Sequence, residues 1–368
     1  MYLELKNLSK SFGEKEVVKN LSLSLGKGEL LCLLGSSGCG KTTTLKMIGG
    51  FLKPDAGEIR VDGQNITCME PEERPVSTVF QSYALFPHLT VLDNVTYGLK
   101  FQKIKKKEAK EMGMKYLEKV GLTEYAHSKI HEISGGQQQR VALVRSLITK
   151  PKVLLLDEPL SNLDAKLRIK MRQEIKQIQR EFDITMVFVT HDQEEAMVLG
   201  DSIAIMDQGN LIQIGKPEEV YTHPANDFAR NFLGVSNCFR DDAGNEIHCR
   251  PEDLFFAVEG NIHGEIIREE FLGFYRQYYI RVTDGSQVLL RAERDIVRQK
   301  GEKVILEMTS HKANLEDVFI ELTEDNGDTA ETGEMEEAEE TEETEETEET
   351  EETENAGEVT NGEEDSEE

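Results

Sequence analysis

The chain has 368 residues and a formal net charge of −29 at pH 7. This length predicts about two folded units. No stretch approaches the roughly 18 consecutive apolar residues of a membrane-spanning helix, and the first residues lack the apolar core of a secretory signal, so any membrane span is expected to come from other chains. The 5 cysteines form no CxxC pair, which predicts neither a disulfide framework nor a zinc site and fits a reducing cytosol.

The first motif in chain order is a glycine-rich loop. It follows the apolar run Leu30–Leu34, typical of a buried parallel strand, reads GSSGCGKT over residues 35–42, and leads into a helical pattern from Thr43. This is G-x-x-x-x-G-K-[ST] in its strand-to-helix context, where backbone N–H groups at a helix N-terminus surround phosphates. Lys41 is predicted to reach the β and γ phosphates, and the Thr42 hydroxyl is predicted to bind Mg²⁺.

The next segment offers weaker candidates. Lysines cluster between residues 103 and 110 without interleaved aromatic residues, which favours a solvated helix face over nucleic-acid binding. His127 and His131 are four residues apart, but no Glu follows the first, so we expect surface residues rather than zinc ligands. The stretch 133–140 reads ISGGQQQR, which looks like a binding loop that lacks the residues that do chemistry.

A second apolar run, Val153–Leu156, ends in Asp157 and Glu158. A carboxylate at the carboxyl end of a parallel strand beside a phosphate loop lies where Mg²⁺ needs an oxygen ligand, so Asp157 is the predicted metal carboxylate. Glu158 points differently and is predicted to orient or deprotonate the water that attacks the γ-phosphate. The alternative is that Glu158 only caps the following helix.

A third apolar run, Met186–Val189, delivers Thr190 and His191 to the same edge of the sheet. A lone histidine is more often structural than functional. The position of His191 at the end of a strand in this sheet instead favours a contact with the γ-phosphate.

The last part of the chain changes character. Two β-rich runs, Tyr278–Val282 and Val288–Ala292, flank an Asp-Gly pair, which predicts a hairpin with a two-residue turn. Residues 324–368 hold 24 Asp or Glu and no Lys or Arg, which predicts a disordered acidic tail. Removing these 24 charges from −29 leaves −5 for residues 1–323, so the folded part is only mildly acidic. The tail could be a solubiliser, a docking segment or nothing specific.

Taken in order, the motifs resemble those of the ATPase subunit of an ATP-binding cassette (ABC) transporter. They are the phosphate loop, Gln81 in VFQSYALFP, SGGQ at residues 134–137, LLLDEP with Ser161–Asp164, and His191 in VTHDQEEA. The resemblance covers residues 1–323. It implies an α/β P-loop NTPase fold, with a RecA-like core and a helical subdomain at about 82–150, inside an ABC domain at residues 1–235.

The resemblance also implies roles for single residues. Phe12 matches the aromatic that stacks on adenine, and Gln81 matches the residue that senses Mg²⁺ and the attacking water. The SGGQ stretch matches the signature motif, although the family usually has Leu at Ile133, and Asp164 matches the loop at the dimer interface. The implied ATP-binding residues are Phe12, Gly35, Ser36, Ser37, Gly38, Cys39, Gly40, Lys41, Thr42 and Thr43. The implied signature residues, which contact the partner's ATP, are Ser134, Gly135, Gly136 and Gln137. The implied catalytic residues are Lys41, Gln81, Glu158 and His191, and the implied Mg²⁺ ligands are Thr42, Gln81 and Asp157.

A second resemblance concerns the C-terminal part. Residues 215–234, GKPEEVYTHPANDFARNFLG, resemble the connector of importer ATPases for oligosaccharides, polyamines, sulfate and ferric iron. Residues 236–323, with RPED at 250–253 and FLG at 271–273, resemble a TOBE-type β-barrel with an oligonucleotide/oligosaccharide-binding-like (OB-like) fold. For this barrel we favour dimerisation or regulation over direct ligand binding.

These resemblances imply an ATPase that uses ATP and Mg²⁺ and works as a homodimer. It would energise solute import through two transmembrane permease subunits, served indirectly by an extracytoplasmic solute-binding protein, from a peripheral position at the cytoplasmic face of the membrane. The permeases would contact the surface near Ala84–Val91, and no nucleic acid is expected. Polyamine and ferric iron are favoured as solutes over sulfate and sugar. A soluble ABC ATPase that acts on DNA or ribosomes is disfavoured, because the sequence has neither a long coiled-coil insertion nor a second cassette.

Overall fold

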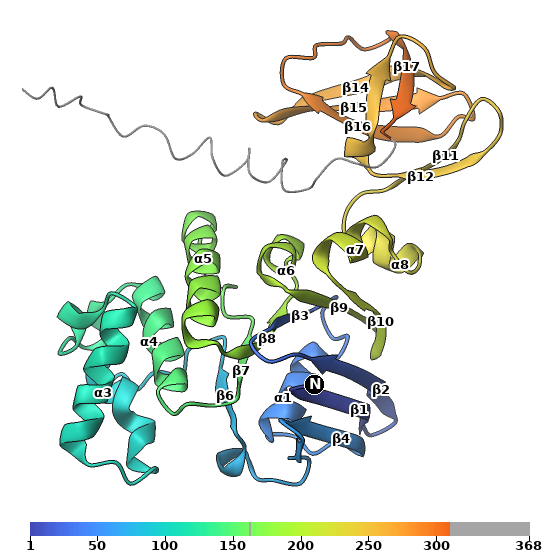
Figure 1. The fold of residues 1–368 in the computed structure, drawn as a ribbon. Helices are drawn as coiled ribbons and strands as arrows, with labels where there is room; N and C mark the ends of the chain where they lie inside the picture. The colour runs from blue at the N-terminus through green and yellow to red at the C-terminus, as the bar shows by residue number, and fades with distance from the viewer. Residues whose placement is uncertain (162, 310–368) are drawn as a thin grey trace, which may run out of the picture. The chain divides into compact units, whose positions relative to one another are not determined.

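The computed structural model describes residues 1–161 and 163–309. The acidic tail expected at residues 324–368 lies outside the described residues. Strands and helices alternate through α8 (Asp227–Phe232), and β-strands dominate after it (Figure 1). This order agrees with the predicted α/β unit followed by an all-β unit.

A six-stranded sheet lies at the centre of the α/β unit. In spatial order its strands are β10 (Asn210–Gly215), β9 (Ser202–Asp207), β3 (Leu30–Gly35), β8 (Thr185–Thr190), β7 (Val153–Asp157) and β6 (Val76–Val79). All neighbours pair in parallel except β9 and β10. The strands β3 and β8 are buried along their whole length, and the apolar runs Leu30–Leu34 and Met186–Val189 lie within them. The three strands expected from the apolar runs are confirmed, and their carboxyl ends share one edge.

The helix that follows the phosphate loop lies between this sheet and an antiparallel one. The second sheet has the order β2 (Lys15–Leu25), β1 (Leu3–Phe12), β4 (Ala56–Val61) and β5 (Gln64–Asn65). One buried cluster joins Leu5 and Leu21 of this sheet to Leu45 of α1 (Lys41–Gly49) and to Leu31 and Leu155 of the central sheet. Packing on two sides therefore holds the start of α1 in place.

Further helices pack against the other face of the central sheet. They are α5 (Ala165–Phe182), α6 (Gln193–Leu199), α7 (Pro217–Thr222) and α8. Their buried residues share one cluster with Leu154 and Phe188 of the sheet, for example Ile175 of α5 and Ala196 of α6. The helices α5 and α6 thus have a fixed relation to the edge where the predicted site residues lie.

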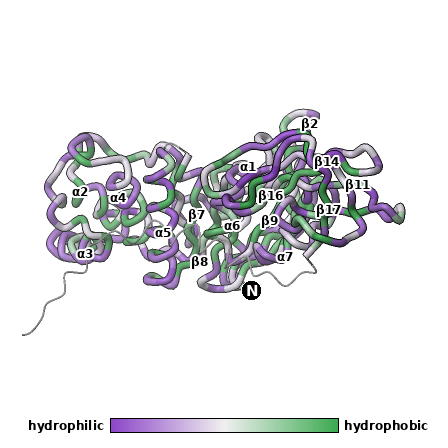
Figure 2. Tube along the Cα trace, turned by 90° about the horizontal axis from the view of Figure 1, so that it is seen from above, coloured by the Kyte–Doolittle hydropathy of each residue, from purple (hydrophilic) through white to green (hydrophobic). Residues whose placement is uncertain are grey.

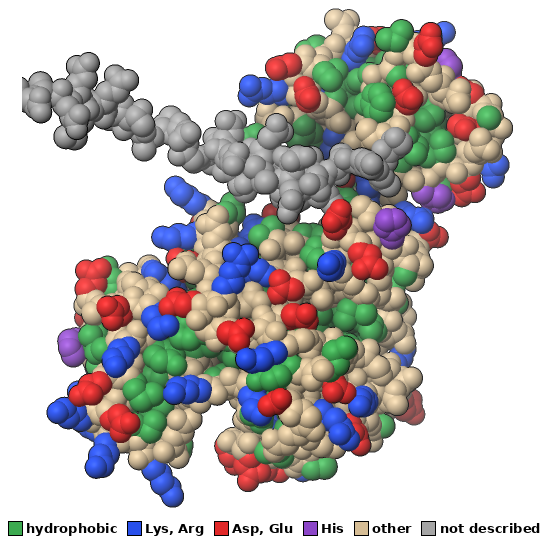
Figure 3. Space-filling view, in the orientation of Figure 1, with side chains coloured by type: hydrophobic (Ala, Val, Ile, Leu, Met, Phe, Trp, Pro, Cys, Tyr) green, Lys and Arg blue, Asp and Glu red, His purple; other side chains and the backbone are tan. Residues whose placement is uncertain are grey.

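The regular elements between Gln81 and β7 are helical. They are α2 (Val91–Thr96), η2 (Tyr97–Lys100), α3 (Lys106–Lys119), η3 (Thr123–Tyr125), η4 (Ile130–Glu132) and α4 (Gly135–Leu147), and a further short helix, η1 (Pro71–Glu73), precedes β6. Most of α3 is hydrophilic in Figure 2, and Figure 3 shows Lys and Arg side chains along this outer part of the molecule. The lysine-rich run is exposed at the start of α3, which confirms the expected solvated helix face.

The C-terminal part forms a β domain with its own core. A two-stranded hairpin, β11 (Asn237–Arg240) and β12 (Glu246–Cys249), precedes η5 (Pro251–Asp253) and a five-stranded antiparallel sheet. The sheet order is β13 (Leu254–Ala257), β17 (Lys303–Met308), β14 (Ile262–Phe271), β15 (Tyr275–Val282) and β16 (Gln287–Glu293). Phe239 and Cys249 of the hairpin share the core of the sheet with Ile266 and Tyr278. The expected OB-like β domain is confirmed.

The turn between β15 and β16 differs from the expectation. The N–H of Val282 donates to the Ser286 carbonyl at 3.0 Å, and the N–H of Gly285 donates to the Val282 carbonyl at 2.9 Å. Three residues, Thr283 to Gly285, therefore form the loop, and Gly285 has φ 88°. The predicted hairpin is present, but the two-residue turn is wrong, because Gly285 takes the left-handed position that ends a three-residue loop.

Candidate functional site

The phosphate loop joins β3 to α1, and its path depends on glycines. Gly38 and Gly40 have φ angles of 79° and 109°, which favour residues without a Cβ. A Cβ on Gly40 would lie 2.7 Å from the Val17 carbonyl oxygen, and one on Gly35 would lie 2.3 Å from that of Met206. Both obstacles are backbone atoms of neighbouring strands, so they cannot move aside as a flexible side chain could.

Lys41 lies inside this loop. The residue is 5% exposed, and its Nζ donates hydrogen bonds to the carbonyl oxygens of Gly35 at 2.6 Å and Ser36 at 3.0 Å. Because the N-terminal end of α1 adds partial positive charge, the loop is suited to an anion such as a nucleotide phosphate. The other predicted loop residues surround this position: Ser36, Ser37 and Gly38 are exposed, Cys39 is buried, and Thr43 is half-buried.

Thr42 and Asp157 meet at the edge of the central sheet. The Thr42 hydroxyl donates to Asp157 Oδ1 at 3.1 Å, which joins the first turn of α1 to the end of β7. Burial raises the pKa of the Asp157 carboxyl, and the hydrogen bond from Thr42 offsets part of this rise. Both side chains offer oxygen atoms as metal ligands, which suit a hard divalent cation.

Glu158 and His191 form a pair at the same edge. Glu158 follows β7 in a left-handed conformation, with φ 44°, and its N–H donates to the Val189 carbonyl at 3.1 Å. Its Oε2 lies 3.3 Å from His191 Nδ1, and His191 directly follows β8. The alternative that Glu158 caps the next helix is wrong, because Asp164 is the N-cap of α5 and accepts a hydrogen bond from the N–H of Leu167 at 2.9 Å.

Gln81 reaches the same group of residues from the end of β6. Its Nε2 donates to Ser161 Oγ at 2.9 Å, and the Ser161 hydroxyl donates to the Glu158 carbonyl at 2.9 Å. Glu158, Ser161 and His191 also line one small pocket. The structure therefore brings Gln81 and the Glu158–His191 pair together through Ser161.

The signature residues lie elsewhere, at the N-terminus of α4. Ser134 caps this helix, because its Oγ accepts from the Gln137 N–H at 3.4 Å while Gln137 Oε1 accepts from the Ser134 N–H at 2.8 Å. Ser134 and Gly135 are exposed, whereas Gly136 is buried against Leu167 of α5. Figures 1 and 2 place α4 beside α3, with α5 and β7 between it and α1. The structure thus does not bring the signature to the phosphate loop of its own chain.

Comparison with known proteins agrees with these two regions. A model of the ABC transporter family matches residues 18–161, and a model of the TOBE domain matches residues 248–315. The spermidine/putrescine import ATP-binding protein PotA of Marinobacter nauticus is 44% identical over 321 residues, which cover 78% of this chain and 86% of the relative. The chain belongs to the ABC importer family of ATP-binding subunits.

Two further relatives lie within the same range of similarity. PotA of Vibrio cholerae is 46% identical over 291 residues, covering 79% of this chain and 74% of the relative. PotA of Mycoplasma capricolum is 40% identical over 327 residues, which cover 81% of this chain and 93% of the relative. As a member of this importer family, the chain binds and hydrolyses ATP, and the hydrolysis is coupled to solute import. Among residues 1–161 and 163–309, no helix is both long and apolar enough to cross a membrane.

The adenine-stacking residue implied for an ABC subunit lies at the end of β1. Phe12 is 52% exposed, and Lys10 Nζ lies 5.8 Å from the centre of its ring. A large aromatic side chain that is half in solvent can stack on a nucleobase without rearrangement of the core.

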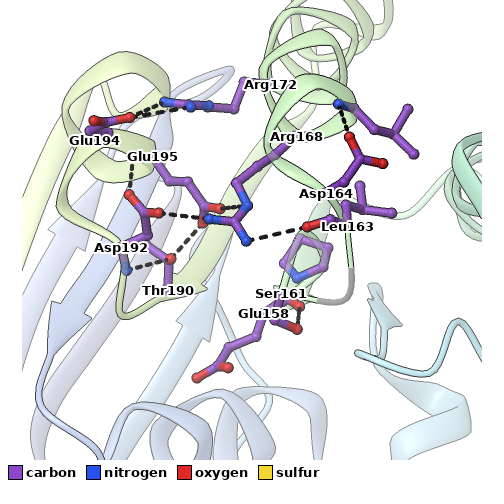
Figure 4. Close-up of polar contacts among 12 residues, drawn as sticks. Glu158, Ser161, Leu163, Asp164, Arg168, Arg172, Thr190, Asp192, Glu194 and Glu195 are labelled. Atoms are coloured by element: carbon purple, nitrogen blue, oxygen red, sulfur yellow. Dashed lines mark hydrogen bonds and ion pairs between the residues drawn. The ribbon is translucent and has the colours of Figure 1, made fainter.

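Arg168 is a site residue that the sequence motifs did not indicate. From the first turn of α5, its Nη1 lies 3.2 Å from Asp192 Oδ2 and its Nε lies 3.6 Å from Glu195 Oε1 (Figure 4). Its Nη2 also donates to the Leu163 carbonyl at 3.3 Å. Arg168 therefore links the segment before α5 to the helix that follows His191.

Glu195 is the buried end of this group of contacts. It is 4% exposed, and the Thr190 hydroxyl donates to its Oε2 at 2.6 Å. Burial raises the pKa of the Glu195 carboxyl, and the hydrogen bond from Thr190 and the charge of Arg168 offset part of the rise. The motifs include Ser161 and Glu195 but assign no role to either residue. Arg168 lies outside the motifs, and its i,i+4 spacing from Asp164 on a helix could have pointed to one face beside the site.

Proposed function

We propose that the chain energises the import of polyamines such as spermidine and putrescine. The observation that supports this choice is the similarity to spermidine/putrescine import ATP-binding proteins of three organisms, at 40 to 46% identity over most of the chain. The site residues common to all such ATPases carry no information about the solute. This proposal therefore selects polyamine from the solutes that the connector left open, ahead of ferric iron, sulfate and sugar.

Uptake in cells that lack the chain tests this choice. Disruption should abolish accumulation of radiolabelled spermidine and leave ferric iron, sulfate and sugar uptake unchanged, and the parent chain should restore it. A Glu158→Gln chain should not restore it. Loss of ferric iron uptake with normal spermidine uptake would overturn the polyamine assignment.

The proposed hydrolysis mechanism rests on the Glu158–His191 pair. Glu158 accepts the proton of the attacking water, and His191, at 3.3 Å from its Oε2, holds the carboxylate in one orientation and contacts the γ-phosphate. Lys41 binds the β and γ phosphates from inside the loop. Gln81, which donates to Ser161, positions the attacking water from the end of β6.

Mg²⁺ fits the pair formed by Thr42 and Asp157. A hydroxyl and a carboxylate oxygen 3.1 Å apart, at the end of the phosphate loop, are the donor types that this ion prefers. Gln81 is proposed as a further oxygen ligand. When bound, the ion would neutralise negative charge on the phosphates.

The signature motif supports a homodimer as the working form. Ser134 and Gly135 are exposed at the start of α4, so their hydroxyl and N–H groups can bind the γ-phosphate of an ATP held by a second copy. Asp164, exposed at the start of α5, would lie in the same interface. Two ATP molecules would then be enclosed between two chains, and hydrolysis would reopen them.

The remaining assignments follow from this role. The proposed bounds are residues 1–235 for the ABC domain, with the helical subdomain at about 82–150, and residues 236–323 for the TOBE domain, of which 310–323 lie outside the described residues. Two permease subunits contact the Ala84–Val91 surface, where Tyr83 and Ala84 have φ angles of 60° and 47° and their carbonyls accept hydrogen bonds from Arg145. The chain is peripheral at the cytoplasmic face of the membrane, and the solute-binding protein acts on it only through the permeases.

A further inference from the structure

A cluster of metal-ligating side chains lies on the β11–β12 hairpin. Cys238 pairs with His248 across the hairpin, and Glu246 lies two residues before His248 on β12. Directly opposed residues, and residues two apart on a strand, point to the same face of a sheet. Because Phe239 and Cys249 face the core of the β domain, Cys238, Glu246 and His248 point into solvent together.

The three donor atoms form a compact triangle. Cys238 Sγ lies 3.9 Å from both His248 Nε2 and Glu246 Oε1, and the last two atoms lie 3.2 Å apart. A tetrahedral zinc ion with ordinary bond lengths would hold its ligands about 3.6 Å apart for sulfur to nitrogen or oxygen, and about 3.3 Å apart for nitrogen to oxygen. Each side of the triangle is thus within about 0.3 Å of a tetrahedral edge.

We propose that Cys238, Glu246 and His248 bind one Zn²⁺ or a similar transition-metal ion, with water as the fourth ligand. A thiolate and an imidazole select such ions over Mg²⁺ and Ca²⁺, which prefer oxygen ligands. Three protein ligands at an exposed position make an open site rather than a closed structural one, so the ion can exchange with solvent. The site lies in the β domain, apart from the residues that bind ATP.

Arg230 is the group that competes with the ion. Its Nη1 lies 3.2 Å from His248 Nδ1 and 2.5 Å from Asp227 Oδ1. While Arg230 donates to Nδ1, the ring carries its proton on Nε2. Metal binding at Nε2 moves that proton to Nδ1, which can then no longer accept a hydrogen bond from Arg230. Arg230 Nη1 keeps its contact with Asp227, and the Cys238 thiol releases its proton to solvent. Binding is therefore coupled to the release of one proton and to a small movement of Arg230.

A cobalt titration of the full-length protein tests the site. The reduced protein, freed of metal by dialysis against a chelator, is titrated with Co²⁺ and then with Zn²⁺. We expect the near-ultraviolet absorption of a thiolate–cobalt bond to saturate at one Co²⁺ per chain and to disappear when Zn²⁺ is added. Carboxylates of the acidic segment at 324–368 and the oxygens of Thr42 and Asp157 also attract cations, but they give no thiolate band.

Matched variants locate the band. Cys238→Ser should abolish it, and His248→Gln should weaken Co²⁺ binding by about tenfold or more. Cys68→Ser removes the other exposed cysteine and should leave the titration unchanged. Because all three positions are exposed, circular dichroism should show unchanged folding. The proposal is overturned if the parent protein gives no band, if the band survives in Cys238→Ser, or if His248→Gln binds as tightly as the parent.

Discussion

Glu158 Oε2 lies 3.3 Å from His191 Nδ1, which joins the residues that follow two adjacent parallel strands, β7 and β8. The pair is accessible, with the Glu158 side chain 26% and the His191 side chain 59% exposed, so a water and a phosphate can reach it. Glu158 is held by its backbone, through the N–H bond to Val189, while His191 orients its carboxylate. In the proposed mechanism, Glu158 accepts the proton of the attacking water and His191 positions the Glu158 carboxylate.

Replacing the histidine tests this division. His191→Ala should lower kcat for ATP hydrolysis by about 10²- to 10⁴-fold, because the base loses its positioning partner, while ATP affinity changes little. Turnover of radiolabelled ATP and equilibrium binding of a fluorescent analogue give the two quantities. His263→Ala, in the β domain, serves as the control and should keep parental turnover; a His191→Ala chain with normal kcat would remove His191 from the mechanism.

The shape of the phosphate loop is tested at Gly40. Gly40→Ala should greatly weaken ATP binding, because the new Cβ would lie 2.7 Å from the Val17 carbonyl oxygen and would displace the loop. Gly63 also has a positive φ, 75°, but has no atom within 4 Å of an added Cβ. Gly63→Ala therefore shows the effect of placing a Cβ at a positive φ without a steric clash. Equal ATP affinities in the two variants would mean that the close approach at Gly40 does not shape the site.

Metal dependence is tested at Asp157. Asp157→Asn keeps the shape of the side chain but removes its charge, so the Mg²⁺ concentration for half-maximal ATPase activity should rise by about tenfold or more. Asp62→Asn, in the turn after β4, should leave the Mg²⁺ titration unchanged. An unaltered titration in Asp157→Asn would show that another group holds the ion.

The contact between Arg168 of α5 and Glu195 of α6 should affect the free energy of unfolding in a pH-dependent way. Burial raises the pKa of Glu195 in the folded protein above its ordinary value, so the folded state binds this proton more tightly than the unfolded state. Stability from this group is therefore present at low pH and is lost as pH rises through the raised pKa. Arg168→Ala removes a charge that lowers this pKa, so it should cost about 1–3 kcal/mol at neutral pH and less at acidic pH.

Thermal unfolding between pH 5 and 8 measures this effect. The double variant Arg168→Ala, Glu195→Gln should recover much of the loss at neutral pH, because no uncompensated buried carboxylate remains. Arg180→Ala changes an exposed arginine of the same helix and should leave the thermal stability unchanged. A loss in Arg168→Ala that is the same at every pH would mean that packing, not the charge of Glu195, explains the role of Arg168.

Asp157, Glu158 and His191 lie at one sheet edge, as the sequence predicted, for a physical reason. The phosphate loop is one continuous segment, and the carboxyl ends of β7 and β8 must share an edge if the strands are parallel neighbours, so Asp157, Glu158 and His191 could be grouped in advance. The contacts of Arg168 could not, because they depend on how α5 packs beside α6. The Cys238–Glu246–His248 cluster depends on the register of a hairpin, which no short cysteine spacing reveals.

Sedimentation velocity of a Glu158→Gln chain with saturating ATP and Mg²⁺ tests most directly whether two chains share the ATP site. This variant keeps Lys41 and the signature but lacks the base, so ATP should remain intact between two copies. We predict that it sediments as a dimer with ATP and as a monomer without it, and that adding Ser134→Arg keeps it monomeric. A Glu158→Gln chain that binds ATP fully and remains a monomer would contradict hydrolysis at a site shared by two chains.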